Sequence, residues 1–180
     1  MEPTLYLDMD GVVADWETSI ADILGYKLVE GDRWPDQDWR QIIQFQRVYR
    51  DIPLLPWALE FVDKACEIAR AANYAVRFLT AVPRRNDFPW AFEDKVHWAN
   101  QYWPTIPVWF GPYSQDKQQR AAPGQILVDA TLGAGGHTRM LAQKVGTMGR
   151  VISLDCDAQM IERTKPSLSG LPVTTVHASF

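Results

Sequence analysis

Two aspartates one residue apart follow a short apolar run at the start of the chain. Asp8 and Asp10 come after residues 5–7, and Gly11 follows them. Because the side chains of a strand alternate between its faces, both carboxylates of such a pair leave the strand on the same side. They repel each other unless a cation lies between them or one holds a proton. The pair therefore predicts phosphoryl or acid–base chemistry with a hard metal such as Mg²⁺, against the alternative of a solvated aspartate-rich turn.

Three later residues stand where they could join this site. Thr80 ends a second apolar run, and Asp129 ends a third. The carboxyl ends of parallel strands meet at one edge of an open α/β sheet, where ligands bind. Lys117 lies between them in a stretch with a helical pattern, and it could supply a positive charge to a phosphate. The alternative for Lys117 is a solvated helix lysine, which is what we expect Lys95 and Lys144 to be.

An aspartate pair, a threonine, a lysine and an aspartate in this order resemble the haloacid dehalogenase (HAD) phosphatase superfamily. The resemblance runs from residue 5 to about residue 131. Within the superfamily the chain is most similar to the 5′(3′)-deoxyribonucleotidases, through residues 8–16, 53–56 and 78–83. The resemblance implies a Mg²⁺-dependent hydrolase that cleaves a phosphate monoester of a (deoxy)nucleoside through an aspartyl-phosphate.

The resemblance also implies a role for each matching residue. Asp8 would attack phosphorus, and Asp10 would protonate the leaving oxygen and then activate water. Mg²⁺ would be held by carboxylate oxygens of Asp8 and Asp129 and by the backbone carbonyl of Asp10. The phosphoryl oxygens would be bound by the Thr80 hydroxyl, the Lys117 ammonium and the backbone N–H groups of Gly11 and Ala81.

Strand and helix patterns alternate along the 180 residues, of which 47% are hydrophobic and 22% charged. This alternation predicts one α/β domain over 1–180, with a Rossmann-like, HAD-type doubly wound parallel sheet. The expected strands are 4–8, 74–79, 106–109, 125–129, 150–154 and 173–176. The expected helices are 15–25, 57–71, 89–102, 114–121, 137–145 and 157–165. Residues 26–53 interrupt the alternation with polar and aromatic residues, and we interpret them as a small helical cap insertion.

The last third of the chain carries a second signature. A strand, a glycine-rich turn with Gly133 and Gly135, a helix and a strand that ends in Asp155 form a pattern typical of nucleotide-cofactor sites. Residues 125–180 resemble the N-terminal third of the S-adenosylmethionine-dependent methyltransferases that modify a cytosine amino group in small-subunit ribosomal RNA. This resemblance implies S-adenosylmethionine as an alternative cofactor. The alternative for the glycines is a simple tight turn.

The two resemblances meet in one strand, which suggests a natural or engineered chimera. A nucleotidase of this branch would carry a second acid where this chain has Ala130. Joining the two families at the strand 125–129 would give one sheet of about six strands in the order 3-2-1-4-5-6, with the segment 125–180 completing it. The rival hypotheses are a chimeric fold without activity and a truncated S-adenosylmethionine-binding methyltransferase fragment.

Composition narrows the range of partners. A net charge of −4 gives no basic face for nucleic acid, and no segment resembles a leader or a membrane span. Cys66 and Cys156 are too few for a disulfide framework, so we expect a cytoplasmic protein in which both are buried. We expect a small-molecule phosphate monoester as partner, neither nucleic acid nor membrane, and the sequence leaves the oligomeric state open.

Overall fold

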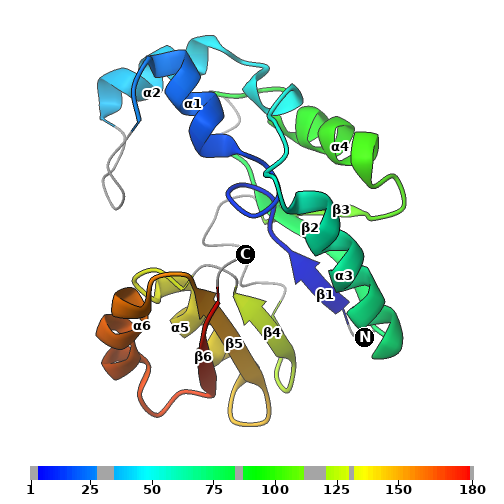
Figure 1. Ribbon diagram of the computed structural model, residues 1–180, viewed down its shortest axis with the longest axis vertical. Helices are drawn as coiled ribbons and strands as arrows, with labels where there is room; N and C mark the ends of the chain where they lie inside the picture. The colour runs from blue at the N-terminus through cyan, green and yellow to red at the C-terminus, as the bar shows by residue number, and fades with distance from the viewer. Residues whose placement is uncertain (1–3, 28–34, 84–86, 112–120, 130–131, 179–180) are drawn as a thin grey trace.

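The computed structural model describes residues 4–27, 35–83, 87–111, 121–129 and 132–178. These residues form two three-stranded parallel sheets with helices packed on them (Figure 1). The strands are β1 (Thr4–Leu7), β2 (Ala75–Ala81), β3 (Val108–Gly111), β4 (Ile126–Asp129), β5 (Arg150–Asp155) and β6 (Val173–His177). The α-helices are α1 (Trp16–Leu24), α2 (Asp36–Gln44), α3 (Ala58–Ala71), α4 (Ala91–Tyr102), α5 (Gly136–Val145) and α6 (Ala158–Thr164). Two short 3₁₀ helices are η1 (Val48–Arg50) and η3 (Lys165–Leu168).

The predicted α/β fold is confirmed, and so is each expected strand. Five of the six expected helices are present within a few residues of their predicted bounds. The sixth, over 114–121, lies almost wholly outside the described residues. Short apolar runs between helical patterns are typical of parallel strands because helices cover the faces of such a sheet, although β4 and β6 keep several side chains exposed here.

The first sheet has the order β1-β2-β3, and the second has the order β4-β5-β6. In the first, Leu7 lies beside Phe78, and Phe78 lies beside Val108. In the second, Leu127 lies beside Val151, which lies beside Val173. Both halves of the predicted order 3-2-1-4-5-6 are therefore present.

The expected junction between the halves differs from the structure. Cα atoms of β1 and β4 approach within 8 Å, but no hydrogen-bonded pairing joins the two strands in the described part of the chain. Figure 1 shows the second sheet set apart from the first. Residues of α3 and α5, together with the two strands, line a cavity between β1 and β4, and the strands do not form the ladder of about 4.8 Å spacing that pairing requires. Ile126 and Val128 of β4 consequently stay 53% and 42% exposed.

Each half has its own hydrophobic core. The first is built on Phe78, Trp98 and Val62, and the second on Val145 and Val151 with a smaller cluster beside it. Among the described residues, no buried side chain belongs to the cores of both halves. The two halves therefore satisfy their packing separately, which is the physical reason that the junction strands need not pair.

The segment predicted as a cap contains α2 and η1. Ile42, Tyr49 and Ile52 from this segment are buried in the same core as β1 and β2. It is thus attached to the first half by packing, while its role as a cap stays a prediction.

None of the described helices is long and apolar enough to cross a membrane. The expectation that both cysteines are buried is wrong, because Cys66 is half-buried and Cys156, in the bend after β5, is exposed.

Candidate functional site

The aspartate pair lies where β1 ends and a tight turn begins. The carbonyl of Met9 accepts hydrogen bonds from the N–H groups of Val13 and Ala14, both at 2.9 Å, and this folds the chain back. Gly11 follows with φ +75°, a backbone conformation that favours glycine. Its N–H donates to Ala14 O at 2.9 Å, so the group that we expected to face a phosphate is used inside the turn. Asp8 Oδ1 accepts from Met9 N at 2.7 Å.

Asp10 and Thr80 are joined by a single buried ammonium group. Lys95 of α4 is 1% exposed, and its Nζ donates to Asp10 Oδ2 at 2.5 Å and to Thr80 Oγ1 at 2.8 Å. Thr80 is fully buried at the end of β2, and its hydroxyl lies 3.4 Å from the carbonyl of the next residue, Ala81. The predicted meeting of the carboxyl ends of β1 and β2 is therefore confirmed for these two residues.

The expectation that Lys95 is a solvated helix lysine is wrong. The buried face of α4 comprises Ala91, Asp94, Lys95, Trp98 and Ala99. Lys95 lies four residues after Ala91 and three before Trp98, which is the spacing of one helix face. This periodicity was visible in the sequence and would have identified Lys95 as inward-facing. Lys144 is exposed, as expected, and Lys117 lies outside the described residues.

An aromatic side chain covers the ammonium. The Nζ of Lys95 lies 4.5 Å from the centroid of the Tyr49 ring, which is a favourable distance for a cation–π contact. Tyr49 itself stacks on Trp16, with 4.9 Å between the ring centroids. Burial, together with the nearby Asp10 carboxylate, raises the pKa of Tyr49 well above its usual value of 10.0. The hydroxyl of Tyr49 therefore stays protonated at physiological pH.

Asp129 belongs to the second sheet. Its Oδ2 accepts a hydrogen bond from Thr138 Oγ1 at 2.6 Å, and the Thr138 hydroxyl lies 2.8 Å from that of Ser153. Both hydroxyls are fully buried, so β5 and α5 orient the carboxylate from behind. The neighbouring Ala130, whose identity bears on this site, lies outside the described residues.

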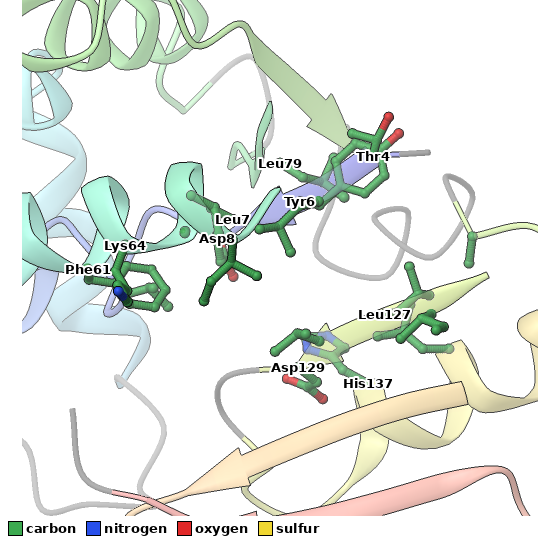
Figure 2. A pocket seen from close by; sticks show the side chains of 18 of the residues that line it. Thr4, Tyr6, Leu7, Asp8, Phe61, Lys64, Leu79, Leu127, Asp129 and His137 are labelled. Atoms are coloured by element: carbon green, nitrogen blue, oxygen red, sulfur yellow. The ribbon is translucent and has the colours of Figure 1, made fainter. Parts of the chain in front are cut away.

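Asp8 and Asp129 line one cavity, of about 330 Å³, between β1 and β4. Figure 2 shows Asp8 on one side of it and Asp129 beside His137 on the other. Most of the remaining wall is apolar and comes from the two strands, α3 and α5. The two residues therefore lie at one cavity, although their strands belong to different sheets.

The donor atoms predicted for Mg²⁺ are of the chemical type that this metal prefers. Oxygen ligands suit Mg²⁺, and the predicted set consists of the Asp8 and Asp129 carboxylates and the Asp10 carbonyl. Each carboxylate uses one oxygen in the hydrogen bonds above. No three His, Cys, Asp or Glu side chains gather as a metal group in the described ranges. Binding of Mg²⁺ here stays a prediction.

The glycine-rich loop of the second half is held by two side chains. Gly133 N donates to Asp155 Oδ2 at 2.9 Å, and Thr164 Oγ1 donates to Gly133 O, also at 2.9 Å. Gly135, at φ +75°, precedes α5, and a Cβ there would lie 2.5 Å from the Thr164 methyl group. The structure therefore brings the glycine-rich loop to Asp155 through Gly133, at the ends of β4 and β5, while the predicted cofactor-binding role of Gly133, Gly135 and Asp155 stays a prediction.

Comparison with known proteins bears on this second half. The MraW methylase family model matches residues 115–180, so the predicted methyltransferase-like segment is confirmed and begins about ten residues earlier than expected. Ribosomal RNA small subunit methyltransferase H from Koribacter versatilis is 36% identical over 66 residues, which cover 32% of this chain and 21% of that protein. The protein of the same name from Shewanella oneidensis is 40% identical over 55 residues, covering 31% and 18%. The chain spans about a fifth of the length of these curated relatives.

Two solved structures are also similar. A Clostridium thermocellum structure assigned as an rRNA-methylase is 33% identical, covers 34% of this chain and 36% of its own, and has a TM-score of 0.33. The Bacillus subtilis structure assigned as the HAD-hydrolase YfnB covers 98% of this chain and 94% of its own, at 10% identity and a TM-score of 0.46.

Proposed function

We propose that the chain carries a phosphomonoester hydrolase site of the HAD type, built on its first half and completed by Asp129 of the second, that acts on a nucleoside monophosphate. The observation that carries the proposal is the contact of Lys95 with both Asp10 and Thr80. It places a carboxylate, a hydroxyl and a fixed positive charge together at the carboxyl ends of β1 and β2. Preorganised charge and hydrogen-bond donors of this kind are what phosphoryl transfer needs from a protein.

The residues divide the reaction between them. A carboxylate oxygen of Asp8 attacks phosphorus, and the bond between phosphorus and the ester oxygen breaks. Asp10 gives its proton to the departing alkoxide and then takes one from the water that cleaves the aspartyl-phosphate. Thr80 and backbone groups beside it, with Ala81 and Lys117 in their predicted roles, bind the phosphoryl oxygens. Mg²⁺, held by Asp8, Asp129 and the Asp10 carbonyl, would offset negative charge on the phosphate.

The test is hydrolysis of deoxynucleoside 5′-monophosphates with and without Mg²⁺, for the wild type and Asp8→Asn. The amide matches the carboxylate in shape but is a poor nucleophile, so kcat should fall by more than about a thousandfold. Asp63→Asn, on the exposed side of α3, is the matched control and should keep full activity. No hydrolysis by the wild type would overturn the proposal and favour a chimeric fold without this activity. Retained activity in Asp8→Asn would remove Asp8 from the nucleophile role.

A second candidate function is S-adenosylmethionine binding by the loop of Gly133 and Gly135. The match of residues 115–180 to the MraW methylase family favours it, as does the convergence of the loop on Asp155. Glycines allow close backbone approach to a ligand, and an acid at the end of the next strand is typical of ribose recognition. Calorimetric titration with S-adenosylmethionine tests this candidate. Binding that is lost in Asp155→Ala would support it, and the absence of wild-type binding would overturn it.

A further inference from the structure

We propose that Lys95 is a positioning residue that sets the directions of the Asp10 carboxylate and the Thr80 hydroxyl. Asp94 supports it by anchoring η1, so that Tyr49 of η1 shields the Lys95 ammonium from water. The inference rests on the proposed function, in which Asp10 is the acid and Thr80 a phosphate ligand. It adds a residue that the sequence pattern did not assign to the site.

The first step of the argument is the direction of hydrogen bonding. An ammonium group has N–H donors and no acceptor, so the Thr80 oxygen must accept from Lys95. The Thr80 proton must therefore go to a different acceptor. In the structure the hydroxyl donates it to Ala81 O over 3.4 Å, which is long for a hydroxyl donor. The Thr80 hydroxyl is thus prepared as a donor to an incoming phosphoryl oxygen.

The second step concerns Asp10, whose Oδ2 faces Lys95. Holding one carboxylate oxygen fixes the rotation of the side chain and directs the other oxygen away from the ammonium. An acid in catalysis must lie within hydrogen-bond reach of the leaving oxygen, and a displacement of about 1 Å is enough to slow a reaction markedly. Lys95 therefore acts on the chemistry through the placement of Asp10.

The third step is the anchor beside it. Asp94 is fully buried, and its Oδ1 lies 2.6 Å from Arg47 Nη2 and 3.7 Å from Arg50 Nη1. The Arg47 guanidinium also lies 5.0 Å from the Trp90 ring centroid. These contacts fasten the chain on both sides of Tyr49 to α4, and Tyr49 covers the ammonium of the next residue, Lys95. Water exclusion strengthens the Lys95 contacts with Asp10 and Thr80.

The experiment compares two esters that differ in their need for an acid. p-Nitrophenyl phosphate has a good leaving group and needs little protonation, whereas a deoxynucleoside 5′-monophosphate releases a poor leaving group and depends on Asp10. In Lys95→Met, kcat for the nucleotide should fall by about a hundredfold or more, and kcat for the nitrophenyl ester by less than about tenfold. Lys95→Arg keeps a charged donor and should recover part of the nucleotide activity. Lys144→Met, on the exposed face of α5, should change neither rate.

Equal losses for both esters would overturn the inference, because a merely structural lysine affects both reactions alike. Full activity of Lys95→Met would overturn it as well. Asp94→Asn is the second variant in case Lys95→Met does not fold, and it should give a smaller loss with the same bias towards the nucleotide. Hydrolysis of neither ester by the wild type would instead overturn the proposed function itself. A double-mutant cycle of Lys95→Met and Asp10→Asn in melting temperature tests the contact without activity, and strictly additive losses would contradict it.

Discussion

The separate cores predict that the two halves of the chain unfold independently, and Val151→Ala tests this. Val151 is fully buried in β5 between Leu127 of β4 and Val173 of β6. The substitution removes two methyl groups, at about 0.8 kcal/mol each, and leaves a small cavity, so the second half should lose about 2 kcal/mol of stability. A unit as small as the second half, with a small core, has a total free energy of unfolding of about 3–5 kcal/mol. The change therefore removes about half of it.

The tryptophans make the assay selective. All eight lie at or before Trp109, so their fluorescence reports on the first half alone, whereas far-ultraviolet circular dichroism reports on both. In Val151→Ala we expect the transition of the second half in circular dichroism to move down by about 10 °C. The fluorescence midpoint should not move.

The matched control is Val62→Ala, which makes the same change at a fully buried position of α3 in the first half. It should lower the fluorescence midpoint. The reasoning is refuted if Val151→Ala lowers the fluorescence and circular dichroism midpoints together. That result would mean that β1 and β4 pair in solution and that the chain unfolds as one six-stranded sheet.

Two further predictions concern single positions. Gly135→Ala should destabilise the second half by more than about 2 kcal/mol, because both the left-handed backbone and the Thr164 methyl group oppose a Cβ there. The control is Gly133→Ala, at φ +46° with open space around it, which should cost only the strain of the left-handed backbone. Equal losses of melting temperature in the two variants would contradict the geometry. The pKa of Tyr49 is raised in the folded protein, so the unfolded chain loses this proton first as the pH rises past about 10. The free energy of unfolding should therefore fall above that pH, and the contribution of Tyr49 should be fully present below it. Tyr49→Phe should flatten that alkaline decline in urea denaturation, and an unchanged slope would argue against a buried Tyr49.

The sequence by itself determined the elements and the strand ends at which Asp10, Thr80 and Asp129 lie. Apolar runs of four to six residues separated by helical patterns gave the strands and helices, because buried parallel strands and amphipathic helices leave different periodicities. The positions of Asp10 and Thr80 after two such runs were enough to predict that they meet. The glycine-rich turn was likewise predictable, since a left-handed backbone depends on local sequence, and Asp155 was predictable from the strand–turn–helix–strand pattern that brings the ends of β4 and β5 together.

Only the tertiary structure decided how the halves meet and which partners the inward-facing Lys95 contacts. Whether β1 pairs with β4 depends on how the two halves pack across the cavity that α3 and α5 help to line, and no local pattern encodes that packing. Lys95 and Lys144 are both helix lysines, and an ammonium is stable in a core only where other elements supply its partners. Asp10, Thr80 and Tyr49 come from three separate parts of the chain, and folding alone places them around Lys95.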